Sequence, residues 1–304
     1  MLVGGRPYYY LEETLRLEKP KTYSVFLGKT IQKKLKTFEE KLEDKIYSDL
    51  LGTRTRIYLS KRQLIEAEKR SRRQKARVMK HGKAHQDEQD EIDSIDFVYT
   101  TLTTEGVPVT RQDADLAYKM AEKGIRNIRD ENLRIALGMT KGLRLVKESK
   151  KGLSRKFILQ LHRTIMSEYG EKHPGKFRKK PAKIYLRSSE RLEEIAFKPS
   201  APGQVAKKID ALVGWYNENV NKLNAIELAA LLHLRLYEIH PFDDGNKRMS
   251  RLLLNKALFD NGYPILNVSR PSEPYFDTLI RSVENHDEKP FVTFVWEKFI
   301  NDIR

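Results

Sequence analysis

The sequence predicts a mainly α-helical protein, a helical bundle with a β-hairpin, and three observations support this fold class. Residues 225–239 (AIELAALLHLRLYEI) are apolar nearly all round, which is typical of a buried helix. Residues 247–260 (KRMSRLLLNKALFD) repeat apolar side chains at helical spacing, and residues 30–95 are polar and rich in residues that favour helices. The loop between the helices predicted at residues 225–239 and 247–260 is short.

The N-terminal part of the chain is expected to be a separate region. Residues 6–29 alternate aromatic and polar side chains around Lys19-Pro20-Lys21, which predicts a small β-hairpin. The residues that follow are helical and polar in pattern, with an interruption near Leu51-Gly52-Thr53. We therefore predict a region at residues 1–95, made of a hairpin and charged helices, followed by a second domain at residues 96–304.

The formal net charge of +16 has a marked local source. Residues 61–83 carry ten basic side chains against only Glu66 and Glu68, and an acidic stretch follows at residues 87–96. This pattern predicts a long, exposed, charge-segregated helix or a helical hairpin. The basic stretch has two interpretations: a surface that binds nucleic acid or an acidic partner, and a solvated helix face. The solvated face is favoured, because no aromatic residues interleave the charges.

From Ile92 onward the helical periodicity returns. Helical segments are predicted at residues 92–106, 111–146, 154–168, 203–223, 277–285 and from 290 to the end. One β-prone stretch, residues 182–186, lies between Gly175-Lys-Phe-Arg178 and Ser188-Ser189, and it predicts a hairpin within the second region.

Composition excludes several classes of protein. The 304 residues include no cysteine, which rules out disulfides, thiolate zinc sites and a cysteine nucleophile. No apolar run reaches the roughly 20 residues that span a bilayer, and Met1–Tyr10 lacks a signal-peptide pattern. We expect a cytoplasmic protein without a membrane segment. His162, His173 and His233 lack a metal-ligand pattern and are interpreted as structural or exposed.

Residues 240–251 (HPFDDGNKRMSR) concentrate more chemistry than any other stretch. Pro241 cannot continue the preceding helix, so His240 lies at its exit. Gly245-Asn246 permit a tight turn into the next helix. The predicted arrangement is helix, short loop, helix, with the loop leading into the N-terminus of the second helix. Such a terminus presents unpaired backbone N–H groups and suits an anion.

The side chains of this stretch suit phosphoryl or nucleotidyl transfer. Arg248 and Arg251 lie three residues apart on one helix face. A guanidinium group binds phosphate oxygens through two parallel hydrogen bonds. Asp244 can hold a divalent ion such as Mg²⁺, and His240 can take a proton near neutral pH. The alternative is an ordinary helix end with a solvated ion-pair cluster. The presence of all these residues in this order argues against it.

These twelve residues resemble the signature of the Fic family, H-P-F-x-[D/E]-G-N-[G/K]-R-x-x-R, at every fixed position. The resemblance implies that His240 is the general base and that Asp244 binds Mg²⁺. It also implies that the nucleotide phosphates are bound by a set of residues around the turn, namely Gly245, Asn246, Lys247, Arg248 and Arg251, with Arg251 on the γ-phosphate.

Two further segments resemble elements of that family. Thr101–Gly106 fits the inhibitory pattern [S/T]-x-x-x-E-[G/N], which implies an inhibitory helix around residues 93–106 whose Glu105 pairs with Arg251. Residues 175–186 resemble the flap that aligns the target protein by strand addition. Tyr275-Phe276 stand where the family often has two tyrosines near the adenine, and core packing is the alternative.

The resemblance implies an autoinhibited adenylyltransferase that moves AMP from Mg-ATP to a Ser, Thr or Tyr hydroxyl of a target protein. Removal of AMP from a modified target, with Glu105 orienting a water, is an alternative activity. A homo-oligomer is a further alternative that the sequence does not decide. Lys247 stands where adenylylating relatives more often have glycine. A bulkier residue at this position resembles the related death-on-curing toxins, which act as kinases. Those toxins generally lack the final arginine that this chain keeps as Arg251. A Fic-type protein kinase and a nucleotide-sensing nucleic-acid-binding regulator remain alternatives.

Overall fold

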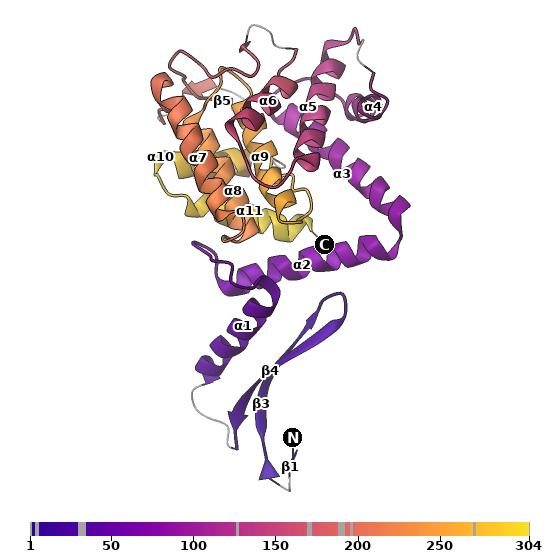
Figure 1. Ribbon diagram of the computed structural model, residues 1–304, viewed down its shortest axis with the longest axis vertical. Helices are drawn as coiled ribbons and strands as arrows, with labels where there is room; N and C mark the ends of the chain where they lie inside the picture. The colour runs from indigo at the N-terminus through magenta and orange to yellow at the C-terminus, as the bar shows by residue number, and fades with distance from the viewer. Residues whose placement is uncertain are drawn as a thin grey trace.

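The structure is a computed structural model that describes residues 2–3, 6–29, 35–125, 128–168, 172–187, 192–194, 197–269 and 272–303. It is mainly helical, as predicted, and elongated, with a helical bundle at one end and a β-hairpin at the other (Figure 1). The helix α2 runs across the middle of the molecule and separates these two parts (Figure 1).

The predicted N-terminal hairpin is present. Two short strands, β1 (Leu2–Val3) and β2 (Arg6–Pro7), pair antiparallel, and the longer strands β3 (Tyr9–Arg16) and β4 (Pro20–Gly28) form the hairpin itself. One face of the hairpin buries Leu15 and Tyr23 as part of the hydrophobic core. The Tyr23 hydroxyl also donates to Asp49 at 2.6 Å, which fixes the hairpin against the following helix.

Three helices follow the hairpin: α1 (Leu35–Leu51), α2 (Lys61–Lys80) and α3 (Lys83–Thr104). The predicted interruption is confirmed, since α1 ends at Leu51 and Gly52 adopts a left-handed φ of 64°. The charged stretch is two helices that meet at an elbow around Gly82, whose φ is 83°. The acidic helix α3 continues unbroken across residue 95.

Basic side chains of α2 make contacts within the chain. Arg62 donates to Glu13 of the hairpin at 2.7 Å, and Arg72 donates to the Leu50 carbonyl at the end of α1 at 2.8 Å. Arg70 donates to the carbonyl of Ile300 near the C-terminus. These contacts attach the hairpin, α1 and the last helix to α2, so this part of the basic run holds the fold together.

The bundle contains the remaining helices and a second hairpin. Its helices are α4 (Arg111–Glu122), α5 (Glu131–Glu148), α6 (Arg155–Ile165), α7 (Val205–Asn219), α8 (Ala225–Ile239), α9 (Asn246–Asp260), α10 (Ser272–Glu284) and α11 (Lys289–Asp302), with a 3-10 turn at Pro202–Gln204. The hairpin is β5 (Tyr185–Arg187) with β6 (Leu192–Glu194).

Two segments of the bundle differ in detail from the sequence expectation. The single run predicted at residues 111–146 is two helices, because the chain turns after α4 at Gly124, whose φ is 67°. The second hairpin begins at Tyr185, three residues after the start of the β-prone stretch predicted at residues 182–186. None of the described helices combines the length and the apolarity that a membrane crossing requires.

Helix α8 is the centre of the bundle, packed by α7, α9 and α11, and its apolar side chains are buried on all sides, as predicted. Its one buried acidic residue, Glu227, is fully inaccessible to solvent. The Glu227 carboxylate accepts three backbone N–H bonds at 2.7–2.8 Å, from Ile57, Tyr58 and Leu59. This carboxylate therefore fastens the loop between α1 and α2 to the central helix of the bundle.

We predict that Glu227→Gln lowers the free energy of unfolding by about 1–3 kcal/mol. The substitution keeps the shape of the side chain but removes the charge that strengthens three buried hydrogen bonds. Urea unfolding followed by circular dichroism measures the change. Glu218→Gln, on an exposed position of α7, is the matched control and should stay within about 0.5 kcal/mol of wild type. Equal stability of the two variants would contradict the proposed fastening.

Candidate functional site

The twelve-residue motif forms the predicted loop between α8 and α9. Helix α8 ends at His240, which adopts a left-handed conformation with φ 49° and ψ 61°. Gly245, with φ 76°, then leads into α9. A left-handed residue that is not glycine is strained, and it persists where the surrounding structure holds it. Several buried side chains supply that constraint here.

The loop is closed by Asn246 and Phe242. The Asn246 side chain accepts from the Phe242 N–H at 2.9 Å and donates to the Phe242 carbonyl at 2.8 Å. The Phe242 ring is fully buried and stacks on the ring of His162, with 3.6 Å between centroids. The amide of Asn246 is thus used to hold the turn, which leaves its backbone N–H at the start of α9.

His162, interpreted from the sequence as structural or exposed, is buried and supports this loop from α6. Its Nδ1 accepts from the Gly175 N–H at 2.9 Å, so its Nε2 carries the proton and donates to the Asp244 carbonyl at 3.1 Å. Burial lowers the pKa of His162 to about 4, which keeps the ring neutral and this pair of bonds intact.

Arg178 clamps the end of α8, and sequence reasoning did not single it out for this. Its guanidinium is buried and donates to the His240 carbonyl at 2.6 Å, while its backbone N–H donates to the Pro241 carbonyl at 3.0 Å. The carbonyls at a helix C-terminus lack partners within the helix, and a cation there also meets the negative end of the helix dipole. No local pattern around residue 178 reveals this contact.

The imidazole of His240 is neutral, and its Nε2 can accept a proton. Its Nδ1 lies 3.4 Å from the carbonyl of Tyr237, a contact that favours a proton on Nδ1 and a free lone pair on Nε2. Burial lowers the pKa of His240 to about 4, and the positive charges of Arg178 and Lys247 act in the same direction. The imidazole is therefore neutral at physiological pH.

The N-terminal part of α9 carries three cations, the partly exposed Lys247 and the buried Arg248 and Arg251. Arg251 has no solvent-exposed side-chain area. It donates to the Thr101 carbonyl at 3.1 Å and to a Glu105 oxygen at 2.7 Å. The structure thus contains the expected ion pair between Glu105 and Arg251.

Glu105 sits at the C-terminal end of α3, just before Gly106, and is close to all three cations. Burial by itself raises the pKa of Glu105, but the charges of Arg251, Lys247 and Arg248 outweigh burial and lower it overall. Its second oxygen lies 3.9 Å from the Lys247 ammonium. The carboxylate is therefore ionised and occupies the position where an anion would meet the α9 turn.

Asp244 lies at the opening of the loop, with 41% of its side chain exposed, and pairs with Arg248 at 3.2 Å. No group of three or more His, Asp or Glu side chains in the described ranges is arranged to hold a metal ion. Asp244 thus has an accessible carboxylate at the opening of the loop, and the neighbouring Asp243 pairs with His173 at 2.9 Å.

The side chains of Tyr275 and Phe276 lie in different environments. The Tyr275 ring is fully buried, and its hydroxyl contacts His233 at 2.9 Å and Arg251 at 3.5 Å, in line with the core-packing alternative. Phe276 lies under the Lys247 ammonium, 4.8 Å from ring centroid to nitrogen. This aromatic pair packs around the cations of α9 from the α10 side.

Comparison with known proteins agrees with this geometry. Residues 152–258 match the Fic/DOC family, a range that includes α6 to α8, the whole loop and most of α9. The chain therefore contains a Fic/DOC family domain, and the resemblance seen in the motif is confirmed.

Sequence relatives include the proteins named protein adenylyltransferase Fic from Drosophila grimshawi and Drosophila erecta. Each is 31% identical over 204 residues, which is 65% of this chain and 40% or 39% of the relative. The match thus spans about two-fifths of the length of these relatives.

Solved structures show that the shared fold extends beyond the matched range. A Fic domain containing signaling protein from Bacteroides thetaiotaomicron aligns with a TM-score of 0.58 at 24% identity, covering 86% of this chain and 93% of that one. Fic-1 from C. elegans aligns with a TM-score of 0.59 at 20% identity, covering 90% and 74%.

We predict that the protein loses stability as the pH falls from about 6.5 to about 4. The pKa of His240 and of His162 is about 4 in the folded protein against 6.5 for an ordinary histidine. Below pH 6.5 the unfolded chain therefore binds protons that the folded protein excludes, and above 6.5 this effect vanishes. Urea unfolding between pH 4.5 and pH 7.5 measures the slope.

His240→Gln should flatten part of this pH dependence, and imidazole NMR should show a neutral His240 at pH 6. His85→Gln, which removes an exposed histidine of α3, is the matched control. A His240 ring that is half protonated near pH 6.5 would contradict the buried environment described above.

Proposed function

We propose that this protein is an autoinhibited adenylyltransferase that transfers AMP from ATP to a hydroxyl side chain of a target protein. The observation that carries the proposal is the 2.7 Å bond between Glu105 and the buried Arg251, within a site that has a neutral His240. The names of the Drosophila relatives support the same reaction class.

The chemistry follows from the positions of the groups. Nε2 of His240 takes the proton of the target hydroxyl, and the hydroxyl oxygen attacks the α-phosphorus of ATP. The bond from the α-phosphorus to its bridging oxygen breaks, so AMP becomes attached to the target and pyrophosphate leaves. Catalysis of this kind depends on positioning and on stabilisation of charge. The N–H groups at the start of α9, with Arg248 and Arg251, supply that stabilisation.

Asp244 fits the role of the Mg²⁺ ligand. Its carboxylate is accessible and stands beside Arg248 at the same opening. Mg²⁺ is usually held by one or two carboxylates together with substrate phosphates and waters, so a single protein carboxylate suffices. When bound with ATP, the ion neutralises part of the phosphate charge.

Glu105 accounts for the autoinhibition. A carboxylate on Arg251 competes with the γ-phosphate for the same guanidinium. Separating a buried ion pair leaves an uncompensated charge, which costs about 3–5 kcal/mol. A γ-phosphate must offset this cost before ATP can bind in the orientation for transfer. The Glu105 carboxylate is also ionised, and an ionised carboxylate can orient a water, so removal of AMP from a modified target is a second activity of the same site.

A protein kinase is the alternative that Lys247 favours. Its ammonium, between Glu105 and the Phe276 ring, adds positive charge to the turn. That charge could place the γ-phosphate, rather than the α-phosphate, next to the hydroxyl. The choice between the two reactions depends on which phosphorus reaches His240. A nucleic-acid surface on α2 has weaker support, because Arg62, Arg70 and Arg72 make contacts within the chain.

We predict that Glu105→Gly increases transfer of label from α-labelled ATP by about a hundredfold, because it removes the competing carboxylate from a buried arginine. The measurement follows label on the protein itself and on proteins of a cell lysate, with α-labelled and γ-labelled ATP in parallel. Glu88→Gln, on an exposed position of the same helix, is the control and should match wild type.

His240→Ala in the Glu105→Gly background should abolish transfer of the α label. Retained transfer in that double variant would remove His240 from the mechanism. Transfer of the γ label instead of the α label would establish the kinase. Movement of neither label would reject both transfer reactions.

A second prediction concerns Lys247. Lys247→Gly should raise transfer of the α label by about two- to fivefold, since a partly exposed ion pair contributes about 0.2–1 kcal/mol to holding Glu105. Its effect should be much smaller than that of Glu105→Gly. Initial rates of α-label transfer measure it. A fall in α-label transfer together with loss of γ-label transfer would favour the kinase over the adenylyltransferase.

A further inference from the structure

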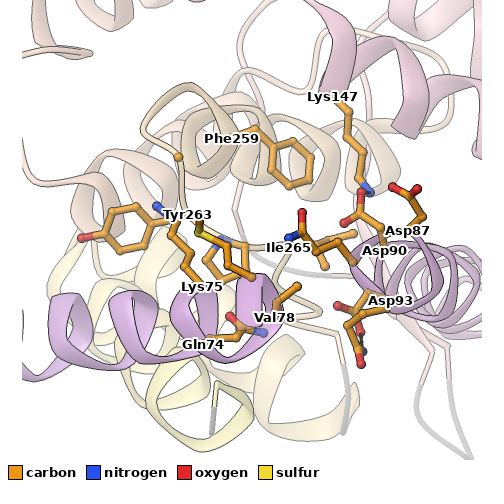
Figure 2. Close-up of a pocket in the computed structure, with 15 residues that line it drawn as sticks. Gln74, Lys75, Val78, Asp87, Asp90, Asp93, Lys147, Phe259, Tyr263 and Ile265 are labelled. Carbon is orange, nitrogen blue, oxygen red and sulfur yellow. Dashed lines mark hydrogen bonds and ion pairs between the residues drawn. The ribbon is translucent and has the colours of Figure 1, made fainter. Parts of the chain in front are cut away.

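A pocket of about 480 Å³ lies at the elbow between α2 and α3, away from the motif loop (Figure 2). Its walls are α2, the first half of α3, the end of α9 and the loop that follows α9. Pockets that hold small molecules commonly have volumes of 300–1,000 Å³ and combine apolar walls with a few polar groups. None of the residues assigned above to nucleotide or target binding lines this pocket.

One part of the pocket is apolar. Val78 of α2, Phe259 of α9 and Ile265 of the following loop contribute side chains to it (Figure 2). All three are only partly buried. A ligand that covered them would remove apolar surface from water, which favours binding by a compact aromatic or aliphatic body.

The α3 side of the pocket is acidic. Asp87, Asp90 and Asp93 follow one another at three-residue intervals and gather at one end of the pocket (Figure 2). Lys147 offsets one of these charges, with its ammonium 3.2 Å from Asp90 and 3.0 Å from Ser94. Asp87 and Asp93 have no ion pair with a described basic residue.

At this end of the pocket the Lys147 ammonium pairs with Asp90, and the Gln89 amide donates one hydrogen bond to Asp93 at 2.9 Å. Burial raises the pKa of Asp93, and the neighbouring charges of Asp90 and Asp96 raise it further. The side-chain oxygen of Gln74, which also lines the pocket, is buried and accepts no hydrogen bond from the described residues. A buried acceptor without a donor costs free energy, so a ligand that brings N–H donors would remove this cost.

The remaining cation of the pocket does not oppose a cationic ligand at the acidic end. Lys75 lies toward Gly262 and Tyr263, at the side opposite the three aspartates (Figure 2). Tyr263 directs its hydroxyl out of the pocket to Glu68, at 2.5 Å. The pocket therefore has one acidic end and an apolar middle, on a chain whose net charge is +16.

We propose that this pocket binds a small organic cation, an amine or guanidinium carried on an apolar body, with the cationic group between Asp87 and Asp93 and the body against Phe259, Ile265 and Val78. The N–H groups of such a ligand match carboxylate acceptors on one side and the Gln74 oxygen on another. This inference is independent of the proposed nucleotide chemistry, since it uses none of its residues.

The test uses tyramine as the probe, because it joins an ammonium to an aromatic ring, and measures binding to the full chain by calorimetry. We expect a dissociation constant on the order of a millimolar or tighter. The uncharged 4-ethylphenol and the anionic 4-hydroxyphenylacetate have the same ring and should bind at least about tenfold more weakly. Equal binding of tyramine and 4-ethylphenol, or no binding of tyramine at about 10 mM, would overturn the proposal.

Variants locate the binding. The double variant Asp87→Asn with Asp93→Asn should weaken tyramine binding by about tenfold or more, since it removes both unpaired charges and keeps the side-chain shapes. Glu88→Gln, on another face of α3, should leave binding unchanged. Circular dichroism confirms that the variants fold. Tyramine binding that is insensitive to the double variant would place the ligand elsewhere and would overturn the proposal.

Discussion

The burial of the Arg251 guanidinium is the constraint on which the arrangement of the site depends. Arg251 is on α9, has no exposed side-chain area, and cannot lose its charge. A buried charge requires a partner, and here the partner is Glu105, 146 positions earlier in the chain. This requirement joins α3 to α9 and fixes the end of α3 over the N-terminal part of α9. The architecture of the site thus depends on one buried ion pair.

The motif residues divide into those that shape the loop and those that face a substrate. Phe242 and Asn246 are used within the loop, and His162 and Arg178 hold it from α6 and from the turn after α6. These contacts keep His240 in a left-handed conformation that places its ring at the end of a rigid helix. The strain of that conformation is offset by buried hydrogen bonds around it.

The residue pattern was sufficient for the helix–loop–helix, because adjacent residues encode it. The pairing of Glu105 with Arg251 was expected only because both segments resemble elements of the Fic family. The residue pattern was insufficient for Arg178, whose role depends on carbonyls about 60 residues away that no local spacing reveals. The basic run of α2 was also ambiguous, since composition cannot tell a solvated cation from one that reaches the hairpin. The break at Gly124 was missed because helical periodicity continues on both sides of it.

The contacts of Glu227 make the helical bundle dependent on the N-terminal segment. Glu227 is a buried residue of α8, and the three N–H groups that donate to its carboxylate belong to the loop at residues 57–59. A chain cut at residue 95 would keep the whole family match and the twelve-residue motif, but it would leave this carboxylate without these three donors in an apolar interior. The N-terminal segment is therefore not an interchangeable attachment. Any natural recombination or laboratory graft of this Fic domain has to carry residues 57–59, or replace Glu227 as well.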